Sequence, residues 1–224
     1  MQETPQLLIV GGPNGAGKST YSGRLSPVGG VVIDIDIITA RMQARFSPDV
    51  PVESIYFAVQ AAFLDQVDEA LKKKQHFTIE TNFRDSELMD TVARFKQNGY
   101  DTKMLYLALN DVERSIERVV QRVSAGGHFV DEHSIRYNFE EGLKNLEYFS
   151  GRFDSLEIVD ASRKPGELKS LLKIKQQRLV YLNDDLPSAV EETVLNIAGR
   201  FNDISRREKN DNEEEQGRDY SLGR

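Results

Sequence analysis

The sequence predicts an α/β fold with three layers, in which a mostly parallel central sheet is flanked by helices. Short apolar runs of strand length alternate with longer segments whose apolar residues recur at helical spacing. A glycine-rich turn follows the first apolar run directly, which is typical of a strand that leads into a helix. With 224 residues, the chain is long enough to bury the core of one such domain.

The first elements follow from these patterns. Leu7–Val10 is the expected first, buried strand, and a helix over Lys18–Leu25 follows the turn. A second apolar run, Val31–Ile33, ends at Asp34 and predicts the second strand. We expect a helix over about Asp36–Phe46, before two prolines interrupt the chain.

The middle of the chain continues the alternation. Apolar residues at helical spacing predict a long helix over Val52–Lys74, and Phe77–Ile79 is the next short strand. A helix over Asp85–Gln97 ends before an Asn-Gly pair, which is a C-cap signal. The strand Met104–Leu109 then leads to Asp111, a good N-cap for a helix that runs to about Ser124.

The last elements complete the predicted sheet. Asp131 is suited to cap a helix that reaches about Phe149, and Leu156–Val159 is the last core strand. Leu171–Leu182 predicts a hairpin that turns near Gln176-Gln177, and Pro187 opens a final helix to about Phe201.

We expect a single domain over residues 1–205, with its core at about 7–160 and the hairpin and final helix at about 171–201. Residues 206–224 are too polar to bury, so we expect a disordered tail there.

Composition excludes several classes of protein. The net charge of −7 argues against a general nucleic-acid binder, which usually carries a basic excess. The absence of cysteine excludes disulfides and thiolate metal sites and fits a reducing cytoplasm. The first residues lack the pattern of a secretory signal, and no apolar stretch approaches membrane-span length. We therefore expect a cytoplasmic protein with no membrane partner.

The segment GGPNGAGKST carries the strongest functional signal. It contains the pattern G-x-x-x-x-G-K-[ST], spelled by Gly12, Gly17, Lys18 and Ser19, between a predicted strand and a predicted helix. This is the phosphate-binding loop (P-loop), in which backbone N–H groups curl around an anion at a helix N-terminus. We expect ATP or GTP to bind here with Mg²⁺, Lys18 reaching the β- and γ-phosphates and Ser19 offering its hydroxyl to the metal. The expected nucleotide-binding residues are Gly12, Pro13, Asn14, Gly15, Ala16, Gly17, Lys18, Ser19 and Thr20.

Acidic side chains follow the second and third predicted strands, at the edge where ligands bind in parallel sheets. Of Asp34 and Asp36, one is suited to accept a proton from a substrate hydroxyl and the other to help hold Mg²⁺ through water. The alternative is that Asp36 merely caps the next helix. Glu80, followed by Thr81, is suited to bind a substrate hydroxyl or to assist the metal, and its alternative is a solvated strand end.

Arginines are the remaining candidates. One predicted helix carries three of them at intervals of four residues: Arg114, Arg118 and Arg122. Arg136 lies on the next predicted helix. Arginines that close over a P-loop would neutralise the charge that develops during phosphoryl transfer. The alternative is a solvated face paired with neighbouring glutamates. For Arg122, the nearby Gly126-Gly127 pair favours a moving lid.

Four segments together resemble the zeta-toxin family of P-loop kinases. They are GGPNGAGKST, IDID at Ile33–Asp36, TIET at Thr78–Thr81, and RVVQRVSAGGHFVDEHSIR from Arg118 to Arg136. The resemblance extends over about Leu7–Val159. Two features depart from the family pattern: Asn82 stands where the family has Thr, and Arg136 is followed by Tyr-Asn instead of further arginines.

The resemblance implies an enzyme that uses ATP or GTP to phosphorylate a sugar hydroxyl of UDP-N-acetylglucosamine or a related small molecule. It implies that Asp36 is the base, that Arg122 and Arg136 neutralise the transferring phosphate, and that Glu80 and Thr81 contact the substrate. We expect Asp34 to contact the substrate as well. An inhibitory, antitoxin-like protein partner is also expected. Two alternatives stay open: a nucleoside or nucleotide kinase, and a non-catalytic ATP-gated binding protein.

Overall fold

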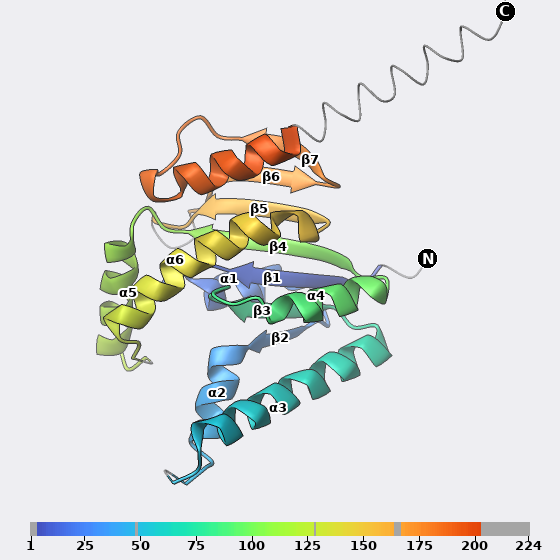
Figure 1. Cartoon of the computed structure of the whole chain (residues 1–224), viewed down its shortest axis with the longest axis vertical. Coiled ribbons are helices and arrows are strands. Elements are labelled where there is room, and N and C mark those ends of the chain that lie inside the picture. Colours follow the sequence, from blue (N-terminus) through green and yellow to red (C-terminus); the bar gives the residue numbers. More distant parts are fainter. Residues whose placement is uncertain (1–3, 48, 128, 164–166, 203–224) are drawn as a thin grey trace, which may run out of the picture.

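The computed structural model describes all residues except 1–3, 48, 128, 164–166 and 203–224. One seven-stranded sheet with the order β2-β3-β1-β4-β5-β6-β7 forms the centre of the molecule (Figure 1). The strands are β1 (Gln6–Gly11), β2 (Val31–Asp34), β3 (Phe77–Thr81), β4 (Asp101–Ala108), β5 (Ser155–Asp160), β6 (Lys169–Lys175) and β7 (Arg178–Leu182). The first five run parallel, whereas β5, β6 and β7 pair antiparallel. The predicted α/β class is confirmed.

Helices connect and cover the strands. They are α1 (Lys18–Leu25), α2 (Ile35–Gln43), α3 (Val52–Lys73), α4 (Leu88–Gln97), α5 (Val112–Ser124), α6 (Glu132–Phe149) and the short 3₁₀ helix η1 (Ser150–Arg152). Residues 188–202 are also helical. Figure 1 shows α4, α6 and the 188–202 helix on one face of the sheet, with α1 on the other. Among the described residues, none of the helices is both long and apolar enough to cross a membrane.

The strand alternation of β1 divides the core between the two faces. Leu7 and Ile9 belong to the larger apolar cluster, with residues of α3, α4 and the 188–202 helix. Leu8 and Val10 point the other way, into a smaller cluster that includes Ala16 of the loop. Burial on both faces explains why β1 reads as a continuous apolar run.

The register gathers the carboxyl ends of the parallel strands at one edge. Gly11 lies opposite Thr81, and Asp34 lies opposite Glu80. The end of β4 is likewise in register with the end of β5. The P-loop and the acidic residues singled out in the sequence are thereby brought together, although Glu80 lies 61 residues after Ser19 along the chain.

Helix starts show where local signals succeed and fail. Asp111 and Asp131 cap α5 and α6, as predicted, by accepting hydrogen bonds from N–H groups three residues ahead. The α4 helix begins at Leu88, later than predicted, because residues 85–87 form a bend and a turn before it. The assignment of 1–205 to one domain stays a prediction, and the tail at 206–224 lies outside the described residues.

Candidate active site

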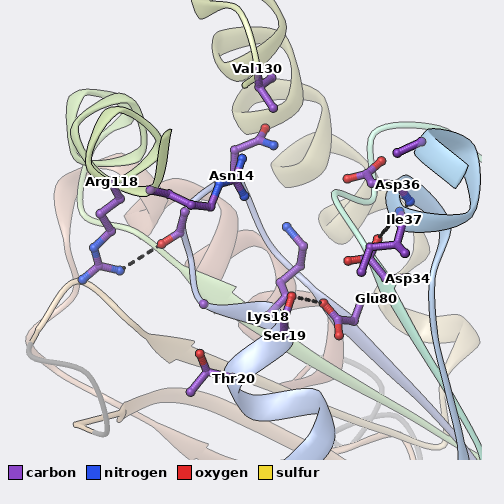
Figure 2. A pocket seen from close by; sticks show the side chains of 14 residues that line it. Asn14, Lys18, Ser19, Thr20, Asp34, Asp36, Ile37, Glu80, Arg118 and Val130 are labelled. Carbon is purple, nitrogen blue, oxygen red and sulfur yellow. Dashed lines mark hydrogen bonds between the residues drawn. The ribbon is translucent and has the colours of Figure 1, made fainter. Parts of the chain in front are cut away.

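A hollow of about 460 Å³ opens at the carboxyl edge of the sheet, over the P-loop. Its walls come from the loop, α2, β3 and α5 (Figure 2). The lining residues are Asn14, Gly15, Gly17, Lys18, Ser19, Thr20, Asp34, Asp36, Ile37, Ala40, Glu80, Arg118, Arg122 and Val130. Most of the residues predicted to bind nucleotide or acceptor therefore border one space.

Two glycines of the loop occupy positions that other residues would not tolerate. At Gly12, whose φ is +142°, a Cβ would lie 2.5 Å from the backbone oxygen of Leu107. At Gly15, whose φ is +75°, a Cβ would lie 2.8 Å from Cβ of Arg118. The loop is thus curled against β4 and α5 in a backbone conformation that only glycine adopts at low cost.

The tip of the loop is held from outside by two helices. Ser115 Oγ of α5 donates to the backbone oxygen of Asn14 at 2.5 Å, and Asn138 Nδ2 of α6 donates to Asn14 Oδ1 at 2.8 Å. Both Asn14 and Asn138 are buried, so these bonds are shielded from water. The conformation of the loop is consequently fixed by tertiary contacts as well as by glycine.

Lys18 lies at the centre of the hollow. Its Nζ donates to Gly12 O at 2.9 Å, to Pro13 O at 3.1 Å and to Asn82 Oδ1 at 2.7 Å. Burial lowers the pKa of Lys18 to about 8, although the carboxylates of Asp36, Asp34 and Glu80 oppose that shift. The ammonium is therefore partly desolvated and ready to exchange carbonyl partners for phosphate oxygens.

Glu80 is buried, with 5% of its surface exposed, so the alternative of a solvated strand end is wrong. Its carboxylate accepts hydrogen bonds from Ser19 Oγ at 2.8 Å and from Ser22 Oγ at 2.5 Å. Thr81 does not line the hollow; its Oγ1 accepts from the N–H of Phe83 at 2.9 Å.

These oxygen groups fit the Mg²⁺ that P-loop chemistry implies. Magnesium prefers hard oxygen ligands and keeps several waters, so a full protein cage is not needed. Because the Ser19 hydroxyl donates a hydrogen bond to Glu80, the lone pairs of Ser19 Oγ stay available to a cation. Within the described residues, no group of three or more His, Asp or Glu side chains is arranged to hold a metal by itself.

The two aspartates after β2 have different roles in the fold. Asp34, not Asp36, caps α2: its Oδ1 accepts from the N–H of Asp36 at 2.9 Å and of Ile37 at 3.2 Å. The alternative reading of Asp36 as the cap is therefore wrong. Partial burial, together with the nearby charges of Asp36 and Glu80, raises the pKa of Asp34. The Asp36 carboxylate lines the hollow across from Lys18 (Figure 2).

The arginines separate into two groups. Arg118 and Arg122 of α5 line the hollow. Arg114 instead pairs with Glu117, as the solvated-face alternative expected. Arg136 lies outside the lining and forms ion pairs of 2.7 Å with Glu113 and Glu132, whose hydrogen bonds raise its pKa. His128 of the Gly-Gly-His stretch lies outside the described residues.

Sequence reasoning missed the structural role of Arg118. Its guanidinium donates to Gly15 O at 3.2 Å, Ala161 O at 2.8 Å and Ser162 O at 3.0 Å. It thereby ties the loop to the segment that follows β5. Sequence reasoning also missed Ser22, Asn82 and Asn138, whose hydrogen-bond partners are distant along the chain. No local pattern identifies such residues, although the sequence does show that Asn82 stands where the family pattern has Thr.

A second hollow of about 860 Å³ adjoins the first along the P-loop and α5. Tyr21, Arg114 and Arg118 contribute to its walls, as do Gly17 and Ser162. The two hollows share Gly15, Gly17, Thr20, Arg118 and Arg122. Together they form an extended space along the loop.

Comparison with known proteins supports this description. A family model described as zeta toxin matches residues 1–167, about three quarters of the chain. The chain belongs to the zeta toxin family of P-loop kinases. This zeta toxin family member is 28% identical, over 128 residues, to an uncharacterized protein of Haemophilus influenzae, a match that covers 57% of the chain and 88% of that protein.

Solved structures share its fold. A structure from the PezAT chromosomal toxin–antitoxin system of Streptococcus pneumoniae has a TM-score of 0.58 at 17% identity, with 90% of this chain and 87% of that chain covered. The complex of AvrRxo1-ORF1 with AvrRxo1-ORF2 and sulphate ions has a TM-score of 0.62 at 14% identity, with coverages of 87% and 64%. At such identities the likeness extends to the fold alone.

Proposed function

We propose that this zeta toxin family member is an ATP-dependent kinase that transfers the γ-phosphate to a hydroxyl group of a small molecule, with GTP as the other candidate donor. One observation carries the proposal: the half-buried lysine of the P-loop and a carboxylate that does not cap a helix border the same hollow. Lys18 supplies the first and Asp36 the second. A phosphoryl donor and an acceptor hydroxyl would meet between them.

At the nucleotide end, the loop N–H groups and the start of α1 would cradle the phosphates. Lys18 would leave the carbonyls of Gly12 and Pro13 and bind phosphate oxygens. Ser19, oriented by Glu80, would hold Mg²⁺, which supplies charge neutralisation of the β- and γ-phosphates when it is bound. The second hollow, beside Tyr21 and Arg118, has room for the base.

At the acceptor end, Asp36 would accept the proton of the attacking hydroxyl. Asp34 keeps α2 in place and so orients Asp36, the second residue of that helix. Arg122, which borders both hollows, would neutralise the charge of the transferring group. Arg136 would have to leave Glu113 and Glu132 before it could take part.

For the acceptor, we propose a nucleotide sugar, with UDP-N-acetylglucosamine as the first candidate. Membership of the zeta toxin family and the IDID and TIET segments support this choice. The acceptor side of the hollow also offers Ile37 and Ala40 as apolar surface beside the carboxylates. A sugar ring presents both hydroxyl groups and apolar C–H faces, which suits such a mixed wall.

The test is an acceptor screen by mass spectrometry, in which the protein, Mg²⁺ and ATP are incubated with UDP-N-acetylglucosamine, AMP or adenosine in separate reactions. An added phosphoryl group on the nucleotide sugar alone is the expected result. Transfer to AMP or adenosine alone would replace the proposed acceptor with that of a nucleoside or nucleotide kinase. Tight ATP binding without transfer to any acceptor would indicate a non-catalytic ATP-binding protein. The Asp36→Asn protein is the matched control.

We further propose an inhibitory protein partner. The solved structures named above support this, since one comes from a toxin–antitoxin system and the other is a complex between two proteins. A partner recovered with the full-length chain at its natural expression level should reduce ATP binding when it is added back. Recovery of the chain alone, fully able to bind ATP, would contradict this proposal.

A further inference from the structure

Asn82, the residue directly after β3, connects the two chemically active ends of the hollow. Its Oδ1 accepts a hydrogen bond from Lys18 Nζ at 2.7 Å, and its Nδ2 donates to Asp36 Oδ2 at 3.4 Å. The side chain is buried, with 8% of the residue exposed. A single amide thus contacts both the ammonium that would bind phosphate and the carboxylate that would accept the proton.

The partners fix the direction of this amide. An ammonium can only donate hydrogen bonds and an ionised carboxylate can only accept them. Asn82 must therefore turn its oxygen to Lys18 and its nitrogen to Asp36. A neutral group that has one donor end and one acceptor end can serve both charges, which a carboxylate or an ammonium at this position could not.

The backbone around Asn82 is fixed by α6. At Gly142 of α6, a Cβ would lie 2.8 Å from Asn82 O, so only glycine permits this close approach. One turn further along α6, Asn145 Nδ2 donates to Phe83 O at 3.0 Å. The helix thus holds the segment from behind, which sets the place of the Asn82 amide between its two partners.

Without an intervening group, the Lys18 ammonium and the Asp36 carboxylate would form a direct ion pair. Asp36 is the strongest of the charges that stabilise the Lys18 ammonium, which is itself desolvated by burial. A direct Lys18–Asp36 ion pair in this partly dry hollow would be favourable. It would occupy both the group needed for phosphate and the group needed for the acceptor proton.

We propose that Asn82 is a positioning residue that keeps Lys18 and Asp36 apart and available for their separate partners. The inference rests on the kinase function proposed above. It predicts a specific failure when the amide is removed: Asp36 captures the Lys18 ammonium, and the triphosphate must then compete with a carboxylate for it. The loss of ATP affinity would therefore depend on Asp36 being present.

The experiment measures the ATP dissociation constant by calorimetry with Mg²⁺ for Asn82→Leu, Asp36→Asn and the double variant. We expect Asn82→Leu to weaken ATP binding about tenfold or more, the effect of hydrogen bonds to charged groups. The double variant should regain most of that affinity, because the Asp36 carboxylate is gone and those of Asp34 and Glu80 are held by their own hydrogen-bond donors. An equal loss in both backgrounds, or no loss in Asn82→Leu, would overturn the inference.

Asn145→Leu is the matched control, because Asn145 supports the same segment by donating to Phe83 O and not to Lys18 or Asp36. Asn145→Leu should lower the melting temperature. Any loss of ATP affinity in this variant should persist when Asp36→Asn is added. If Asp36→Asn also restored ATP affinity in Asn145→Leu, the effect of Asn82→Leu would come from general destabilisation of the segment, and the inference would fail. If the wild-type protein binds no ATP, the proposed function fails; if only the rescue is absent, this inference alone fails.

Discussion

The two ends of the hollow are built in different ways. At the nucleotide end, the loop is held by hydrogen bonds from α5 and α6, by the Lys18 contacts and by close packing against β4. At the acceptor end, α2 contains no fully buried residue, and Ile37, which borders the hollow, is 46% exposed. One end is a preformed socket, and the other is an open surface with a fixed carboxylate.

This difference indicates that nucleotide binding depends on one end of the hollow and phosphoryl transfer on the other. A preformed loop loses little conformational entropy when it binds phosphate, so nucleotide affinity should depend on its fixed groups. The open side can admit a large acceptor, with reactivity concentrated in one carboxylate. Substitutions at the first end should therefore reduce binding and transfer together, whereas those at the second should reduce transfer alone.

The largest effect is expected at the nucleotide end. Lys18→Ala should abolish detectable turnover and weaken nucleotide binding about a hundredfold, because Lys18 is the single lysine among the residues that line the hollow. Calorimetry with Mg²⁺ and ATP measures the binding, and single-turnover transfer measures the chemistry. Wild-type affinity in this variant would mean that the loop does not hold the triphosphate.

Asp36→Asn should separate the two ends. Transfer should fall about 10²- to 10⁴-fold, the usual contribution of a general base, while the ATP dissociation constant changes by less than about threefold. The same two measurements apply. Transfer at the wild-type rate would remove Asp36 from the mechanism, and a large loss of affinity would show that the two ends are not independent.

Glu80 tests how firmly the socket depends on its buried hydrogen bonds. Glu80→Gln should weaken Mg²⁺-dependent ATP binding about tenfold, because an amide cannot accept from Ser19 and Ser22 with both of its ends. Titration of ATP with and without Mg²⁺ gives the metal-dependent part. Ser22→Ala is the control: it should retain more affinity, since Ser19 keeps its partner. Unchanged affinity in Glu80→Gln would contradict this account.

The pH dependence tests the charge on Lys18. Because its folded pKa is about 8, ATP affinity should be constant below pH 8 and fall about tenfold per pH unit above it, as the unliganded protein loses the proton. Lys18→Arg, which stays protonated, should show no such fall. A flat profile in the wild-type protein would contradict a desolvated ammonium.

The same lowered pKa has a consequence for folding. The unfolded chain, with the ordinary lysine pKa of 10.5, binds more protons than the folded chain between pH 8 and 10.5. The unfavourable contribution of Lys18 to the stability of the unliganded protein should thus be fully present below pH 8 and be relieved as the pH rises through that window. Denaturant unfolding of wild type and Lys18→Arg measures this difference.

The smallest effect is expected at Arg136, outside both hollows. Arg136→Ala should change transfer less than about threefold, since exposed ion pairs contribute little. Arg122→Ala, on the wall of the hollow, should lower transfer about a hundredfold. Single-turnover rates of the two variants decide the matter. Equal, large losses would mean that Arg136 leaves its glutamates and closes over the phosphate.

Much of this architecture is encoded locally. Apolar periodicity predicts the order of strands and helices, and the spacing of Gly12, Gly17, Lys18 and Ser19 predicts the phosphate loop, because each depends on residues close in sequence. The caps at Asp111 and Asp131 are local in the same way. The alternative in which Asp36 caps α2 is wrong although Asp34 and Asp36 are equally suited to a cap by residue type, because the helix starts directly after Asp34 at the end of β2.

The tertiary structure alone decided which groups face one another. Lys18 meets Asn82, Glu80 meets Ser22, and Arg118 meets the loop, across separations of 58 to 103 residues that no sequence pattern spans. Parallel pairing of β1, β2 and β3 brings these side chains to one edge of the sheet. The chain itself specifies a phosphate-binding turn, whereas sheet register and helix packing determine the charges that surround it, because electrostatic contacts depend on distance in space.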